Sequence, residues 1–255
     1  VKLMRFFWGK TAFYLLLILG WFLLAHSGFW PEYMLPAPEK VFQTLGAGFR
    51  SGRYLLAVFV SIRRLLLGYL ISLAIGIPLG MVTGKYRWLD ETVGSLLVGL
   101  QTLPSICWLP LSLLWFGLSE QAILFVVVMG AVLSITVATN SGVKNVAPLY
   151  IRAGKNMGAK GVVLFARIIL PAALPSIVIG LKQGWSFAWR SLMAGELLFI
   201  NLGLGHLLMM GRELNDMAQV IAVMFVVIML GLLFDRLLFS RLEKAVRRRW
   251  GFDHP

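Results

Sequence analysis

The segment RAGKNMGAKGVVLFARIILPAALP, residues Arg152–Pro175, lies between two long apolar stretches of the chain. It carries four cations and no acid, and three glycines and two prolines interrupt it. Clusters of such residues between apolar stretches are typical of loops with a defined backbone shape. A chain this apolar therefore keeps one strongly cationic loop between two of its expected membrane spans.

A short helix is expected at the start of this loop. Pro148 suits its first turn, because the N–H that proline lacks would have no partner there. Leu149, Ala153 and Met157 follow at i, i+4 and i+8 on one face, and Gly158 can end the helix. An apolar stripe with cationic flanks is typical of a docking element for a partner. The alternative is a solvated loop whose charges only fix the topology.

The composition places this loop in a membrane protein. Of the 255 residues, 59% are hydrophobic and 14% are charged, whereas a soluble domain has about half and about a quarter. Apolar runs of the length needed to cross a bilayer, about 20 residues, recur along the chain. The cations behind the net charge of +13 lie at the ends of these runs. They indicate membrane topology and contact with anionic lipid, and not a nucleic-acid partner.

Six apolar stretches are expected to form the transmembrane helices of one all-α domain. The first follows Lys2, Arg5 and Lys10 as in a signal peptide, but it lacks a convincing small-residue cleavage site and is expected to be retained. Glu39–Phe49 is expected to form a short helix at the membrane interface. The predicted loop covers residues 140–171, and the predicted spans cover residues 11–25, 56–83, 93–116, 122–138, 172–194 and 217–234.

The distribution of cations predicts the orientation. With the N-terminus inside the cell, most lysines and arginines near span ends fall on the cytoplasmic side, as the positive-inside rule requires. Arg63 and Arg64 count against this orientation unless they lie within an extended second helix. Both termini and the cationic loop are therefore predicted to be cytoplasmic.

Small residues line one face of the second span. Gly68, Ser72, Gly76, Gly80 and Gly84 recur every fourth residue, so they share a helix face that lets another backbone approach closely. This face either packs within one subunit or takes part in a dimer interface or a moving contact.

The fifth span carries the polar residues that could touch a transported solute, since ionisable groups at membrane depth are costly and often functional. Lys182, Trp185 and Trp189 share one face, with Arg190 beside it and Glu196 at the far end. The two cations could line an electropositive passage for an oxyanion, and the indoles could shape it. Alternatively, the cations pair with Glu196 or with a carbonyl of a neighbouring helix, or extend to the interface.

The third span is interrupted by Pro104 and Pro110, with Trp108 between them. Broken helices often line pathways through membranes, so Pro104 and Trp108 are further candidate pathway residues. The alternative is that both prolines only kink the helix.

Catalytic and metal-binding motifs are not found in the sequence. The only trace of a phosphate-binding loop is GKT at Gly9–Thr11, where Met4 takes the place of the first glycine. The histidines have no ligand spacing to Cys107 or to the acids, and a single cysteine excludes an internal disulfide. A self-sufficient secondary transporter would need buried acids and a repeated architecture, but only Glu196 and Asp235 lie near membrane depth. No cofactor and no enzymatic activity are expected in this chain.

The cationic loop resembles the cytoplasmic signature of ABC importer permeases, E-A-A-x3-G-x9-I-x-L-P. Ala153 and Gly154 take the places of the two alanines, and Arg152 replaces the glutamate. Gly158 matches the glycine of this signature, and Ile168, Leu170 and Pro171 match the I-x-L-P at the end of the signature without a gap. Met157 lies on the apolar face directly before that glycine.

Further segments are similar to one branch of these permeases, the nitrate/sulfonate/taurine type. The matching segments are LPAPEKVFQTL (residues 35–45), SIRRLLLGYLISLAIGIPLGMVTG (61–84), LPSICWLPLSLLWFGLSEQA (103–122) and LMAGELLFINLGLG (192–205). Several such segments in the same order are more specific than any one of them.

The resemblance implies a type I importer fold in a bacterial inner membrane. Two permease subunits, here expected to be a homodimer, would form the pathway, and an external binding protein would deliver the substrate. A cytoplasmic ATPase dimer, which binds ATP and Mg, would dock on the loop residues Arg152 to Gly158 and on Ile168, Leu170 and Pro171. The implied substrate is a small anion or zwitterion such as a sulfonate, taurine, nitrate or bicarbonate. The alternatives are a neutral vitamin or pyrimidine precursor or, less favoured, secondary transport.

Overall fold

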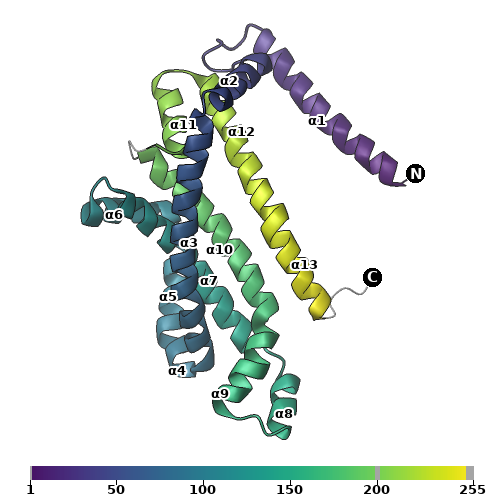
Figure 1. Ribbon diagram of the computed structural model, residues 1–255, viewed down its shortest axis with the longest axis vertical. Coiled ribbons are helices and arrows are strands. Elements are labelled where there is room, and N and C mark those ends of the chain that lie inside the picture. The colour runs from purple at the N-terminus through teal and green to yellow at the C-terminus, as the bar shows by residue number, and fades with distance from the viewer. Residues whose placement is uncertain (1, 199–201, 251–255) are drawn as a thin grey trace. The chain divides into compact units, whose positions relative to one another are not determined.

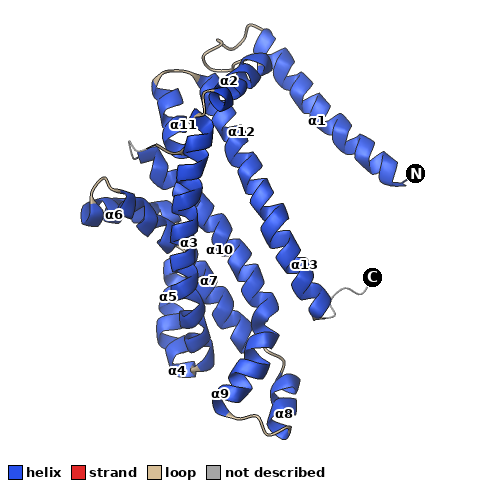
Figure 2. Cartoon of the chain, viewed as in Figure 1, coloured by secondary structure: helices blue, strands red, loops and turns tan. Residues whose placement is uncertain are grey.

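A computed structural model describes residues 2–198 and 202–250 of the chain. Every regular element among these residues is a helix, which confirms the predicted all-α class (Figure 2). The longer helices are α1 (Lys2–His26), α2 (Pro38–Arg50), α3 (Arg53–Lys85), α7 (Glu120–Lys144), α8 (Pro148–Asn156), α10 (Leu170–Leu198), α11 (Leu204–Glu213), α12 (Met217–Phe234) and α13 (Ser240–Arg249) (Figure 1).

Shorter helices connect these elements. They are α4 (Arg87–Leu89), α5 (Ser95–Gln101), α6 (Leu109–Phe116) and α9 (Gly161–Leu164). Three π-helical turns, Asp90–Gly94, Phe165–Ile169 and Asp235–Phe239, make α4–α5, α9–α10 and α12–α13 continuous, and a 3-10 turn, Ser105–Trp108, precedes α6. Proline has no backbone N–H, and its ring crowds the carbonyl four residues before it. The wider π turn Phe165–Ile169 directly before α10 leaves room for the ring of Pro171, so the helix continues through this residue.

Four helical stretches are long and apolar enough to cross a membrane: α3, α7, Gly161–Leu198 and Met217–Val246. The bent segment that contains α5 and α6 is a fifth if it counts as one span, and the apolar part of α1 is shorter. These segments match the six predicted stretches, but their ends differ. α7 continues to Lys144 and α10 begins at Leu170, so the predicted loop 140–171 is largely helical. Polar Thr139 and Asn140 are buried within α7. The predicted span ended at residue 138 because these two residues interrupt the apolar pattern.

The third predicted span, residues 93–116, is not one straight helix. Arg87–Gln101 and Ser105–Phe116 meet at an angle of 101°, and the bend falls at Pro104. Pro104 has extended backbone dihedrals (φ −55°, ψ 135°) and cannot continue the first arm. Pro110 lies in the first turn of α6, where the missing N–H costs no hydrogen bond. Of the two prolines, only Pro104 marks a break.

Contacts group the described residues into two compact units, one within residues 1–60 and 200–229 and the other within residues 61–199 and 230–255. In the first unit, the Trp21 indole of α1 donates a hydrogen bond to the Pro36 carbonyl at 3.1 Å. Asp216 begins α12, since its Oδ1 accepts from the backbone N–H of Gln219 at 3.0 Å. The Gln219 amide in turn donates to a carbonyl of α11 at 2.9 Å. Side-chain caps and amide bonds thus position α11 and α12 in this unit.

In the second unit, α3 packs against α7 along the predicted face of small residues. A Cβ atom at Gly80 would lie 2.5 Å from the Thr136 carbonyl oxygen and 2.6 Å from the Thr139 Cβ. Ser72 is buried and donates its hydroxyl to the Gly68 carbonyl at 2.8 Å. This face meets α7 along its whole length, through Gly68, Gly76, Gly80 and Gly84. Packing within the subunit therefore accounts for it.

α10 packs against the other side of α7 in the same manner. A Cβ atom at Gly184 of α10 would lie 2.6 Å from the Ile135 Cγ1, and one at Gly142 of α7 would lie 2.9 Å from the Ser176 Cβ. Ser119 begins α7 by accepting a hydrogen bond from the Ala122 N–H at 3.4 Å. α7 is thus held between two helices whose backbones come close to its own (Figure 1).

Replacing Gly80 by alanine should lower the free energy of unfolding by about 1–3 kcal/mol, the usual cost of overpacking. The added Cβ would press against a backbone carbonyl of α7, which has little freedom to move. The matched control is Gly99→Ala in α5, where a Cβ meets nothing within 4 Å and alanine favours the helix. Thermal unfolding of both purified variants in detergent measures the difference. Equal melting temperatures would show that this contact tolerates a methyl group.

Candidate functional site

The predicted short helix of the cationic loop is α8. Pro148 occupies its first turn, and Gly158 follows its end with a positive φ of 86°. The Gly158 N–H donates to the Lys155 carbonyl and the Ala159 N–H donates to the Gly154 carbonyl, both at 3.0 Å. This pair of bonds is the Schellman motif, which places its left-handed residue one position after the helix. Gly158 therefore fixes where α8 stops and in which direction the chain leaves.

One face of α8 is attached to the rest of the second unit. Gly154 is buried, and a Cβ at this position would lie 3.0 Å from the Leu164 Cδ1 and 3.3 Å from the Ile168 Cγ1. Ile151 and Leu170 both pack against a buried apolar cluster at the end of α7 and the start of α10, formed by Val143, Val146, Ala173 and Ile177. Positions that the signature motif places far apart in sequence, Gly154 and Ile168, are thus in contact. α8 is fixed to both α7 and α10.

The opposite face of α8 is exposed. Leu149 is 73% exposed and Met157 is 81% exposed, and Ala153 lies between them on the same face. Arg152 and Lys155 are also exposed, and no hydrogen bond or ion pair of Arg152 is found within the described part of the chain. We define this surface, Leu149, Arg152, Ala153, Lys155 and Met157, as the α8 face. It is an exposed surface that is both apolar and cationic.

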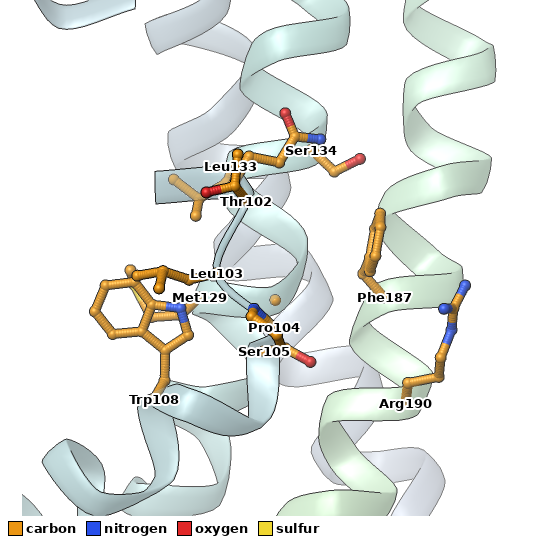
Figure 3. A pocket seen from close by; sticks show the side chains of 12 residues that line it. Thr102, Leu103, Pro104, Ser105, Trp108, Met129, Leu133, Ser134, Phe187 and Arg190 are labelled. Carbon is orange, nitrogen blue, oxygen red and sulfur yellow. The ribbon is translucent and has the colours of Figure 1, made fainter. Parts of the chain in front are cut away.

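A cavity of about 280 Å³ lies at the bend between α5 and α6 (Figure 3). It brings together three of the candidate pathway residues: Pro104 and Trp108 from the bent segment, and Arg190 from α10. α7 completes it with Ser134, whose hydroxyl is buried and has no hydrogen-bond partner among the described residues. No acidic residue is among the described residues that line it. This space, called the bend cavity below, is also lined by Gln101, Thr102, Leu103, Ser105, Met129, Gly130, Leu133 and Phe187.

The Arg190 guanidinium borders the bend cavity without an acidic partner. Its Nε donates to the Ser186 carbonyl of its own helix at 3.3 Å, and it lies over the Phe187 ring at 5.0 Å. In the described part of the chain no carboxylate lies within ion-pair distance of it. A guanidinium has five N–H donors, so most of its hydrogen-bonding capacity remains available to a ligand.

Lys182, Trp185 and Trp189 line a second cavity of about 300 Å³, which Arg190 also borders. The three residues therefore border the same space. However, Lys182 Nζ lies 3.0 Å from the Asp235 Oδ1 and 3.8 Å from a Glu243 oxygen. The idea that Lys182 and Arg190 both contribute free positive charge is therefore wrong for Lys182. Its partner comes from the segment after α12, which helical spacing within one span could not reveal.

Comparison with known proteins identifies the family. The model of the binding-protein-dependent transport system inner membrane component family matches residues 76–248. The chain belongs to this family. An ABC transporter permease protein of Methanocaldococcus jannaschii is 38% identical over 80% of this chain and 78% of its own length. The aliphatic sulfonates transport permease protein SsuC of Escherichia coli is 31% identical over 90% of this chain and 87% of its own.

The fold agrees with this assignment. An inward-facing structure of the MetNI methionine ABC transporter matches with a TM-score of 0.64 at 18% identity, covering 76% of this chain and 95% of that chain. The protein is the permease subunit of an ABC importer, a multi-pass membrane protein with the type I importer fold. The resemblance recognised in the cationic loop is confirmed.

Glu196 lines neither of the two cavities described above and belongs to a buried ion pair. It is 0% exposed and accepts a hydrogen bond from Arg64 Nη1 at 2.9 Å and from the Ser61 hydroxyl at 2.7 Å. Arg64 Nε also donates to the Glu120 Oε1 at 3.2 Å, and Arg63 pairs with the same carboxylate. These residues tie α3, α7 and α10 together at one end of the unit. Glu196 is therefore better explained as a structural residue than as a pathway residue.

Sequence reasoning missed Arg64 as the partner of Glu196. The available signal was the pairing rule for membrane-embedded charges: a buried acid in one apolar helix requires a cation in another. Only two arginines, Arg63 and Arg64, lie inside the apolar α3, apart from Arg53 at its first residue.

Arg64→Met should destabilise the permease by about 3–5 kcal/mol, because it leaves the Glu196 charge buried without its partner. The double variant Arg64→Met/Glu196→Leu should recover most of this loss, since an apolar pair of similar size replaces the ion pair at little cost. Thermal unfolding of the wild type, both single variants and the double variant measures the coupling. Additive losses in the double variant would mean that the two residues do not act as a pair.

Proposed function

We propose that the permease is driven by a cytoplasmic ABC ATPase dimer that docks on the α8 face and that holds the ATP and Mg. The exposed Leu149 and Met157 would insert into a groove of the ATPase, and the neighbouring cations would meet acidic groups around it. The Schellman turn at Gly158 supports this role, because it gives α8 a defined end and orientation.

Transmission from α8 to the pathway would follow from its attachment. α8 packs on the end of α7 and the start of α10, and both of these helices line the bend cavity. A displacement of α8 by the ATPase would move them as rigid elements, and the cavity would change its access from one side to the other. Rigid-body motion of packed helices is a known basis for such transitions.

We further propose that the transported solute is a small oxyanion or zwitterion, of the sulfonate, taurine, nitrate or bicarbonate type. The observation that carries this proposal is the Arg190 guanidinium, which borders both cavities without a carboxylate partner in the described residues. An electropositive passage favours an anion over a cation. The similarity to a permease named for aliphatic sulfonates supports the same class. A neutral vitamin or pyrimidine precursor is the competing substrate.

The proposed assembly contains two copies of this chain, the ATPase dimer and an extracytoplasmic binding protein. Both termini would be cytoplasmic in a bacterial inner membrane, by the excess of cations on that side. Arg63 and Arg64 do not weigh against this orientation, because both lie within α3 and pair with Glu120.

The docking proposal predicts that Leu149→Asp prevents the ATPase from copurifying with the permease. An aspartate at the centre of an apolar contact would be buried without a partner, whereas Leu149 is 73% exposed in the free chain, so folding should not suffer. Leu214→Asp is the matched control, because Leu214 is 68% exposed and lies outside α8. If Leu149→Asp still binds the ATPase and imports at the wild-type rate, docking uses another surface.

The substrate proposal is tested by ATP-driven uptake into proteoliposomes that contain the complex and its binding protein. Small sulfonates, nitrate, taurine and bicarbonate are compared with a neutral pyrimidine of similar size. Uptake of at least one of the anions or the zwitterion, and not of the pyrimidine, is expected. Selective uptake of the neutral compound would replace the proposed substrate class.

A further inference from the structure

We propose that the bend cavity is a binding site for a small organic oxyanion, built by a single permease chain from Arg190 of α10 and Ser134 of α7. The inference rests on the proposed anionic substrate, and it goes further by assigning the site, its residues and the kind of anion. It implies that the permease itself holds the solute during transport.

The charge of the cavity favours an anion. Arg190 is its one lining cation among the described residues, and no acid lines it. The second cavity is the useful contrast, because there the Lys182–Asp235 pair cancels the lysine charge. Arg190 is therefore the cation that can pair with a ligand, and its planar N–H fork matches two oxygens of a sulfonate or carboxylate.

Two hydroxyls in this region have no hydrogen-bond partner among the described residues. Ser134 is only 2% exposed and lines the cavity, and its Oγ has no hydrogen-bond partner among the described residues. The same holds for Ser191, which is completely buried and packs against Gly130, another lining residue. A buried hydroxyl without a partner is costly, and of these two residues only Ser134 lines the cavity, so a ligand there would complete its hydrogen bonding. Figure 3 shows Ser134 on α7 and Arg190 on α10, with the Phe187 ring between the two side chains.

The remaining walls limit the size and chemistry of the ligand. At about 280 Å³ the space is at the lower end of ligand pockets, which typically measure about 300–1,000 Å³. Trp108, Leu133 and Phe187 give it an apolar side, and Gln101 and Ser105 add polar groups. An apolar side beside a cationic one fits an anion with a short carbon tail better than a bare inorganic ion. The ligand class is therefore a small organic sulfonate or carboxylate.

The bend at Pro104 is what opens this space. If Arg87–Phe116 were one straight helix, the backbone around Pro104 would not turn away by 101°, and Trp108 would not line this space beside α7. The site therefore depends on a local break in the chain, and it lies beside the two helices to which α8 is attached. Movement of those helices would change the shape of the site.

The test measures equilibrium binding of radiolabelled ethanesulfonate to the full detergent-purified complex of permease and ATPase, without nucleotide and without binding protein. Saturable binding is expected that propanesulfonate displaces and propanamide, a neutral molecule of similar size, does not. Arg190→Gln should weaken binding by about tenfold or more, the loss expected for a charge-assisted hydrogen bond. Arg212→Gln is the matched control and should bind like the wild type, because Arg212 belongs to α11 and lines neither cavity.

Ser134→Ala separates a ligand-binding role from a structural one. Its hydroxyl has no partner without ligand, so the variant should melt at or above the wild-type temperature and yet bind ethanesulfonate more weakly, by about threefold or more. A variant that melts lower and binds equally well would assign Ser134 to the fold and overturn its part in the site.

The outcomes distinguish this inference from the proposed function. Wild-type complex that imports a sulfonate but shows no saturable binding, or Arg190→Gln complex that binds as tightly as wild type, overturns the site. Binding that depends on Arg190 in a complex that imports only neutral solutes supports the site and overturns the proposed substrate class.

Discussion

The close approach of α7 to α3 on one side and to α10 on the other is the constraint on which the second unit depends. Lipid tails are as apolar as leucine side chains, so helices in a membrane associate mainly through packing and buried polar contacts. Small residues provide that packing here, at Gly80 against Thr136 and at Gly184 against Ile135. Because α7 is confined on two sides, the end on which α8 packs and the cavity residue Ser134 belong to one rigid element. The connection between α8 and the bend cavity follows from this confinement.

The charged residues of the second unit differ in whether another residue of the chain pairs with them. Glu196 is paired with Arg64, and Lys182 is paired with Asp235, so these groups stabilise contacts between helices. Arg190 differs because its described contacts are a carbonyl of its own helix and an aromatic ring. Arg190 is exposed, so its guanidinium is open to a negatively charged ligand. Position in the sequence does not distinguish these cations, but their partners do.

Much of the fold was predictable from the sequence because it depends on local patterns. The start of α8 at Pro148, its end at Gly158 and the small-residue face of α3 all follow from spacing within one segment. The bend at Pro104 was only partly predictable, since Pro110 carries the same signal and yet lies in an ordinary first turn. The partners of Glu196 and Lys182 were not predictable, because they come from helices far away in the chain. Periodicity describes which face a residue occupies and not which helix covers it.

Cys107 lies in the turn between the bend and α6, directly before Trp108 of the cavity wall. It is exposed, and it is the only cysteine in the chain. A fluorophore or spin label attached to this thiol would therefore report from the rim of the cavity at a single known position, in the wild-type sequence. The permease thus carries a natural reporter whose surroundings could be followed through the transport cycle.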